Sequence, residues 1–192
     1  PLSSSAASDV YKRQVMNFCG ALEASWPADM AELDSCEGRT IVQGTMFHTT
    51  NGGTQIINSL WHGIPEFANA DRVWMPSGHS EGRVASAADE IVIDAHVVEA
   101  LDLSLGDIVN IGAGSSPVEF SVVGIGYHPL HVFMAPEGSI FPPEPGQYVV
   151  GYVSESGMAR LTNSSIGNSN IIMLDVEGTC LLYTSPSPRD TA

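Results

Sequence analysis

The most regular pattern of hydrophobic and polar positions lies in residues 89–111, and it predicts a strand, a short helix and a second strand. Three consecutive β-branched residues at 91–93 are typical of a short buried strand. Asp94 follows where a helix N-cap is favoured, because its carboxylate can accept from the free amides of the first turn. Three apolar residues then share one face of the predicted helix: Val97, Val98 and Leu101. Gly106-Asp107 indicates a turn before the second strand at 108–111, and nothing in this folding unit is chemically reactive.

Similar patterns predict the other elements of the chain. Asn51-Gly52-Gly53 is the strongest hairpin signal, and the β-branched and aromatic residues on both sides of it predict two strands. Gly124 and Gly126 interrupt an alternating strand and indicate a bulge or a crossing point. Ser154 is placed to cap a short helix that reaches Leu161. In full, the sequence predicts strands at 39–50, 54–64, 118–127, 148–153 and 171–176. It also predicts one or two helical turns at 28–33 and a long loop at 66–88.

The two ends of the chain differ from the rest and are set apart from the fold prediction. Residues 4–14 resemble the in-frame translation of a transposase-type sequencing adapter, and residues 180–190 resemble its partner. We therefore treat 1–14 and 180–192 as adapter-derived and not natural. The natural part, about residues 15–179, is then expected to be a metagenomic fragment cut at both ends from a longer gene. A Ser-rich tail at each end is the alternative.

Charge narrows the possible partners. The chain has a formal net charge of −15, and without the two ends it has no lysine and only four arginines: Arg39, Arg72, Arg83 and Arg160. Nucleic acid and anionic lipid surfaces would be repelled by such a chain. The balance suits a solvated surface in a salty or extracellular setting.

Cysteines and hydropathy bear on the cellular compartment. Cys19 and Cys36 are the only cysteines of the natural part. Their separation allows a disulfide if the domain lies outside the cytoplasm, and two buried free thiols are equally compatible with it. No apolar run approaches the roughly 20 residues that a membrane-spanning helix needs, and no signal peptide is visible. In a fragment, this absence says nothing about membrane attachment of the parent protein.

Several short motifs in a fixed order carry a resemblance to a known family. They are Asp-Glu-Ile-Val-Ile-Asp at 89–94, Ala-Leu-Asp-Leu at 100–103, Leu-Gly-Asp-Ile-Val-Asn-Ile at 105–111 and Phe-Ser-Val-Val-Gly-Ile at 120–125. Similar pieces continue at 127–129, 135–142 and 152–154, and Cys-Glu-Gly-Arg at 36–39 begins the series. Together they resemble the MacB-like periplasmic domain of FtsX-like ABC-transporter permeases over most of residues 39–176. Residues 15–35 match poorly.

The resemblance implies a fold and a division of the chain. The implied fold class is α+β, a β-rich two-subdomain extracytoplasmic domain with short helices packed on small mixed sheets. We expect residues 15–88 to form an α/β subdomain of a helix and a hairpin with a connecting loop. Residues 89–154 would form the β-rich subdomain, and residues 155–179 a helix and strand that return to the first.

The resemblance also implies a function at the cell membrane, on its extracytoplasmic side. Such a domain couples the ATP-driven motion of a partner ATPase to export, lipoprotein release or signalling. The implied partners are an ABC ATPase subunit, a second permease subunit, and an extracytoplasmic protein or substrate. No enzyme activity or cofactor is implied for this chain, because ATP is hydrolysed on a separate subunit or domain. The chain also lacks a Gly-rich loop ending in Gly-Lys-Ser/Thr.

Four histidines are the best candidates for a metal site. His128 and His131 could present two imidazoles, and His62 or His79 could add a third ligand for zinc. A spacing across a proline is not a recognised ligand pair, however, so we expect a loop of partly exposed histidines beside Tyr127.

Three other groups of residues offer weaker chemistry, and no catalytic, cofactor or metal residue is predicted from them. A nucleophilic triad of Ser77, His79 and an acid (Asp71 or Glu81) lacks the Gly-x-Ser-x-Gly turn that exposes a nucleophile. Asp89 and Glu90 are expected to be solvated rather than poised for acid-base work. An aromatic patch for a peptide or lipid could be formed by Trp61, Phe67 and Trp74, although such residues are more often core.

Two alternatives to the transporter hypothesis stay open. A secreted or surface module that binds a small molecule or peptide predicts polar flanking sequence. A double-psi-barrel-like enzyme domain shares the strand, helix, Leu-Gly-Asp and strand pattern. It predicts a pocket with convergent, pKa-perturbed groups near Asp94 and Asp107.

Overall fold

The computed structural model describes residues 33–50, 52–65, 73–78, 80–114, 116–136, 138–166 and 169–176. The described strands are β1 (Leu33–Thr50), β2 (Gly53–Ile64), β3 (Glu81–Gly82), β4 (Glu90–Asp94), β5 (Ile108–Gly112), β6 (Val118–Gly126), β7 (Tyr148–Ser154) and β8 (Ile171–Val176). The described helices are α2 (Ala95–Val98), the 3-10 helix η1 (Pro129–His131) and α3 (Glu155–Thr162). The chain is therefore β-rich with short helices, as the predicted α+β class requires.

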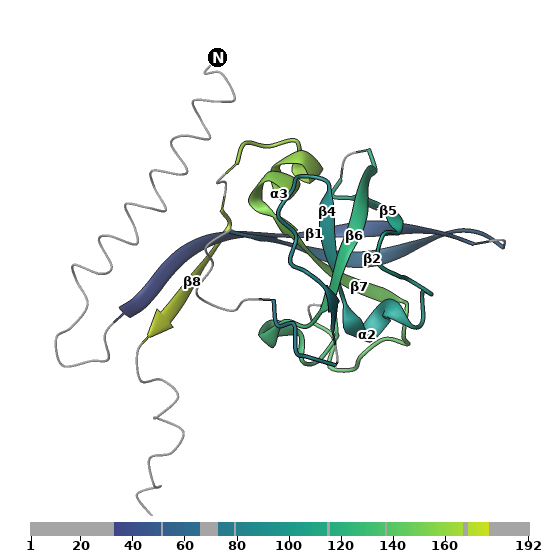
Figure 1. Ribbon diagram of the computed structural model, residues 1–192, viewed down its shortest axis with the longest axis horizontal. Coiled ribbons are helices and arrows are strands. Elements are labelled where there is room, and N and C mark those ends of the chain that lie inside the picture. Colours follow the sequence, from purple (N-terminus) through teal and green to yellow (C-terminus); the bar gives the residue numbers. More distant parts are fainter. Residues whose placement is uncertain are drawn as a thin grey trace, which may run out of the picture.

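Six strands close on themselves into a barrel. The sheet order is β2-β7-β4-β6-β5-β1, and β1 also pairs with β2, so the circuit has no open edge. β2 runs parallel to β7, and β4 runs parallel to β6. The other four neighbouring pairs are antiparallel. In Figure 1, β4 and β6 run across the direction of β1 and β2, as opposite walls of a twisted barrel do.

The barrel interior is filled by apolar side chains from every wall. Trp61, Ile91, Ile93, Ile111 and Val149 are completely buried there. The indole of Trp61 donates to the carbonyl of Gly112 at 3.1 Å, which satisfies its one polar atom inside the core. Full burial of such side chains contributes roughly 1.5–3 kcal/mol each, so barrel closure is the main stabilising feature of the fold.

β7 is buried on both of its faces, which explains its continuous apolar sequence. Val149 and Val153 face the barrel interior. Tyr148, Val150 and Tyr152 belong to a second apolar cluster, and Val73 and Met75 pack against that cluster. Part of the long loop predicted for residues 66–88 therefore covers one face of the barrel.

The local signals of the sequence are confirmed. Thr50 pairs with Gly53 across the predicted hairpin turn. Asp94 caps α2 by accepting from the amide of His96, and Ser154 caps α3 by accepting from the amide of Gly157. The pairing of β4 with β6 shifts register between Ile91 and Val92, opposite Gly124, where the bulge was expected.

The first part of β1 leaves the barrel and forms an antiparallel ribbon with β8. Leu33 pairs with Val176 and Arg39 pairs with Ile171, so the two ends of the described unit lie side by side. Figure 1 shows this β1–β8 ribbon extending to one side of the barrel, while the β1–β2 hairpin extends to the opposite side. β1 thus serves as both a ribbon strand and a barrel strand.

The structure changes two expectations about organisation. β1 and β2 were expected in one subdomain and β4 to β7 in another, but all six are walls of one barrel. The two-subdomain arrangement is therefore not confirmed, and the boundaries 15–88, 89–154 and 155–179 stay a prediction. Of the helical turns predicted at 28–33, Leu33 belongs to β1 and residues 28–32 lie outside the described residues.

Candidate functional site: a buried histidine cluster

Three histidines from two distant parts of the chain meet at one end of the barrel. His62 comes from the end of β2, and His128 and His131 come from the turn that begins directly after β6. The ring centroids of His62 lie 4.8 Å from His131 and 5.4 Å from His128. The Nε2 atoms of His62 and His131 are 2.8 Å apart, a hydrogen-bonding distance. We call these three residues the histidine cluster.

The sequence folds locally in a way that presents these rings. His128 is the N-cap of η1, and its Nδ1 accepts from the amide of Leu130 at 3.2 Å. Pro129 occupies the first turn, where its missing N–H costs nothing. The single turn of η1 then brings His131 back over His62 at the barrel end.

A tyrosine and an aspartate extend the histidine cluster into the barrel wall. The ring of Tyr152 stacks on His128 with centroids 5.2 Å apart. Its hydroxyl donates to Oδ2 of Asp94 at 2.7 Å. The other oxygen of Asp94 accepts from the amide of His96 at 3.1 Å and lies 2.6 Å from Nδ1 of the same residue. Asp94 is fully buried, so one carboxylate both caps α2 and holds Tyr152.

Arg39 connects the histidine cluster to the β1–β8 ribbon. Its guanidinium is buried and donates to the carboxylate of Glu37, with an Nη2 to Oε1 distance of 2.6 Å. The Nη1 atom lies 3.4 Å from Nε2 of His128. The buried guanidinium needs an oppositely charged partner such as Glu37, because the cost of its desolvation is otherwise uncompensated.

The surroundings keep the His62–His131 pair neutral near pH 7. Burial, followed by the positive charge of His131, His128 and Arg39, lowers the pKa of His62 to about 2. Burial also lowers the pKa of His131, and the negative charge of Asp94 partly opposes it. Burial raises the pKa of the Tyr152 hydroxyl, and Asp94 raises it further. Two neutral imidazoles can share one hydrogen bond, since one ring nitrogen donates and the other accepts.

One buried side-chain nitrogen of the histidine cluster has no hydrogen bond in the described part of the chain. Among the described residues, Nδ1 of His62 is buried without a hydrogen bond. A buried unsatisfied nitrogen costs about 1–3 kcal/mol. His62 is therefore held in place by the fold at some expense of stability.

The prediction of partly exposed histidines beside Tyr127 is wrong for His128, whereas His131 is partly exposed. His62 is 1% exposed and His128 is 2% exposed, because the end of β2 and the start of η1 pack together with Tyr152. In the part of the chain that the structure describes, no three His, Cys, Asp or Glu side chains are placed to hold one metal ion. His79, the other histidine considered for zinc, lies outside the described residues.

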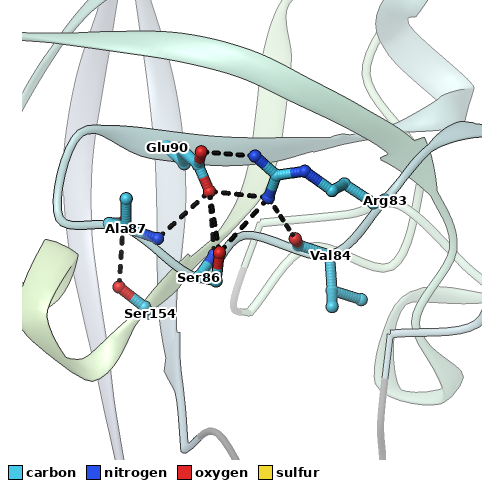
Figure 2. A network of polar contacts seen from close by, with 6 residues as sticks. All are labelled: Arg83, Val84, Ser86, Ala87, Glu90 and Ser154. Carbon is cyan, nitrogen blue, oxygen red and sulfur yellow. Dashed lines mark hydrogen bonds and ion pairs between the residues drawn. The ribbon is translucent and has the colours of Figure 1, made fainter.

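Glu90 is not the solvated acid that was expected. Its carboxylate accepts from Arg83, from the Ser86 amide and hydroxyl, and from the Ala87 amide, as Figure 2 shows. The hydrogen bonds from Arg83, Ser86 and Ala87 lower the pKa of the Glu90 carboxyl. Glu90 therefore organises the turn before β4, which Ser154 also holds through the Ala87 carbonyl. Asp89 beside it is exposed.

The other predicted groups do not come together as proposed. Trp61 is buried in the barrel core, whereas Trp74 is 63% exposed. Asp107 accepts from the amide of Ser104 at 2.8 Å in the turn before β5, while Asp94 belongs to the barrel wall. Ser77 and Glu81 are both exposed. The remaining members of these groups, Phe67 and Asp71, lie outside the described residues.

Two observations concern the setting of the domain. Cys36 is disulfide-bonded, whereas Cys19 lies outside the described residues, so the pairing of these two cysteines stays open. Of the helices that the structure describes, none has the length and hydropathy to cross a membrane.

Two domains are among the solved structures that are similar to this chain. One is the extracellular domain of the noncanonical ABC-type transporter YknZ from Gram-positive bacteria, with a TM-score of 0.45 and 15% identity, covering 79% of this chain and 70% of that one. The other is a domain of a putative permease protein from Porphyromonas gingivalis, with a TM-score of 0.41 and 12% identity, covering 90% and 70%. No protein-family model and no curated protein matches the chain.

Proposed function

We propose that this chain is the extracytoplasmic domain of an ABC-transporter permease, and that it passes motion from the membrane to a partner or substrate outside. The observation that carries the proposal is the β1–β8 ribbon. Leu33 and Val176 pair at its end, so the chain enters and leaves the barrel at the same place. A domain inserted between two transmembrane helices needs this arrangement, since both of its connections must return to one membrane surface.

The junction between the ribbon and the barrel is built as a stiff joint. The amide of Asn170 donates to the carbonyl of Arg39 at 2.9 Å. The side chain of Asn170 then bonds both backbone groups of Ile41, accepting at 2.9 Å and donating at 2.7 Å. Arg39, buried at the same junction, pairs with Glu37 of the ribbon, and its guanidinium lies 3.4 Å from the ring of His128. These contacts would make the ribbon and the barrel turn together when the ribbon is pulled.

Two further observations support an extracytoplasmic setting. Disulfide bonds such as that of Cys36 form and persist in oxidising compartments. The formal net charge of −15 suits a solvated domain and disfavours nucleic acid and anionic lipid as partners. In this proposal the barrel contacts a partner outside the membrane, and an ATPase subunit and a second permease subunit act through the membrane part of the parent protein.

The unbroken parent gene provides the first test. We expect an apolar segment of about 20 residues on each side of the domain, with one soon before residue 15. Polar flanks on both sides would exclude the transporter and favour a stand-alone module.

A second candidate, a double-psi-barrel-like enzyme domain, has one observation in its favour. The fold is a closed six-stranded barrel. Asp94 accepts from Tyr152, whose ring lies 5.5 Å from that of His62, and the pKa values of Tyr152 and His62 are both strongly shifted. All three side chains are buried, however, whereas an active site needs access for its substrate. A barrel alone does not define a function, so the transporter domain is the better supported proposal.

A further inference from the structure

We propose that Trp74, Tyr127 and His96 form a surface site for a small organic cation that carries a quaternary ammonium group. We call these three residues the aromatic row. The proposal does not rest on the transporter function, because it follows from the rings and charges of the barrel surface. It also differs from the predicted patch of Trp61, Phe67 and Trp74, of which only Trp74 takes part.

The three rings follow one another across the surface. The Trp74 and Tyr127 centroids are 6.1 Å apart with the planes inclined by 52°. The Tyr127 and His96 centroids are 5.3 Å apart with the planes at 89°. Inclined rings present more than one face to a single bound group, and the faces of tryptophan and tyrosine attract cations through their quadrupoles.

The backbone holds this exposed tryptophan rigidly. Trp74 and Tyr127 exchange two hydrogen bonds, from the Trp74 amide at 2.7 Å and from the Tyr127 amide at 2.9 Å. Val73 and Met75, on either side, pack against the buried cluster of β7. A side chain at Gly126 would collide with Met75, so this segment lies close against β6. Trp74 nevertheless keeps 63% of its surface exposed, which leaves its indole available to a ligand at little cost in ordering.

The third ring, that of His96, is held in place by the buried carboxylate of Asp94. Nδ1 of His96 lies 2.6 Å from the buried carboxylate of Asp94, and the imidazole itself is 40% exposed. Asp94 has a second partner in the Tyr152 hydroxyl. The His96 ring is therefore held in one orientation beside Tyr127, with an acid behind it.

Charge decides which ligand suits the aromatic row. The formal net charge is −15, and the sequence contains no lysine or arginine between Arg83 and Arg160, the segment that supplies Tyr127 and His96. The field of such a surface concentrates cations and repels anions. The aromatic row contains no lysine or arginine to pair with a phosphate or carboxylate ligand, so a cation is favoured over an anionic ligand. A neutral sugar, which also stacks on aromatic rings, is the competing ligand that the experiment must separate.

Choline and its neutral isostere 3,3-dimethylbutan-1-ol provide the test, because they share a shape and differ in charge. Each would be titrated into the full chain at constant ionic strength, with binding followed by tryptophan fluorescence and by calorimetry. We expect saturable binding of choline in the millimolar range, at least fivefold weaker binding of the isostere, and weaker choline binding as salt rises. Equal binding of the two compounds, or binding of glucose without binding of choline, would overturn the proposal.

Variants locate the site. Trp74→Ala should weaken choline binding at least tenfold, and Trp74→Phe should retain part of it. Phe133→Ala is the matched control, since Phe133 is another exposed aromatic residue (55%) outside the aromatic row, and it should leave binding unchanged. Thermal unfolding of each variant checks that the fold is intact. Undiminished choline binding by folded Trp74→Ala would refute the assignment.

Discussion

Lowering the pH from 7.5 to 4.5 should destabilise this protein through His62. In the folded state the pKa of His62 is about 2, below its ordinary value of 6.5. Below pH 6.5 the unfolded chain therefore binds a proton at His62 that the folded chain does not bind. The stability from His62 is fully present above pH 6.5 and is lost as the pH falls from 6.5 toward 2. At pH 4.5 the loss is about 3 kcal/mol, because each pH unit below the unfolded pKa costs about 1.4 kcal/mol.

Urea unfolding at the two pH values measures this loss. The whole protein contains many carboxyl groups whose titration also changes stability, so the informative quantity is a difference between variants. In His62→Gln the glutamine keeps a polar group beside His131 and does not titrate. We expect its loss of stability between pH 7.5 and 4.5 to be smaller than that of the natural sequence by about 2–3 kcal/mol.

The matched control is His48→Gln, which removes one imidazole from the β1–β2 hairpin and leaves the histidine cluster intact. The effect of His62→Gln on the pH dependence should clearly exceed that of the control. The two variants and the natural sequence could lose the same stability between pH 7.5 and 4.5, within about 0.5 kcal/mol. That result would refute the claim that buried His62 is neutral in the folded state.

Three further predictions concern packing and the buried polar groups. Gly44→Ala should lower the free energy of unfolding in urea by about 1–3 kcal/mol, because a Cβ there would meet the Gly112 carbonyl at 2.1 Å. An unchanged stability would mean that the barrel closes differently. Asp94→Ala should lower the free energy of unfolding by about 1–3 kcal/mol. The loss should be smaller in a Tyr152→Phe background, since the Tyr152 hydroxyl donates to Asp94. If the effects of the two substitutions simply added, that contact would be contradicted. Arg39→Met should speed hydrogen exchange of the β8 amides more than that of the β4 amides, because Arg39 is buried where the ribbon meets the barrel. Equal changes in both strands would contradict a local effect of Arg39 on this junction.

The features that the sequence predicted are those that depend on neighbouring residues. Asp94 and Ser154 cap the helices that follow them, and Gly52 lies in the turn of the predicted hairpin. Each of these needs only a few adjacent residues, because a cap or a tight turn is decided by local backbone geometry. The apolar alternation of β6 was predictable for the same reason.

Barrel closure could not be predicted in this way. It depends on the parallel pairs β2–β7 and β4–β6 and on β1 having partners on both sides. These pairings join segments that lie far apart in the chain, and no local pattern states which strands meet. The continuous apolar run of β7 was the one available signal, since a strand buried on both faces must lie inside a larger sheet.

The histidine cluster was only partly predictable. His128 and His131 are near neighbours in a distinctive motif, and His62 was named as one of two possible third members. Nothing in the sequence indicated that His62 and His131 would be hydrogen-bonded across 69 residues. Burial of His62 and His128 was missed because neither the strand end at His62 nor the His-Pro-Leu-His motif indicates which residues will cover these rings.

The side of the membrane on which the barrel lies is the most direct test of the proposed function. Glu119→Cys places a thiol at an exposed position of β6, and a small membrane-impermeant maleimide applied to intact cells that express the complete parent protein reports its location. The parent protein without the new cysteine provides the background. We predict labelling of Cys at position 119 in intact cells. Labelling only after the cells are lysed would place the barrel in the cytoplasm and contradict the proposal.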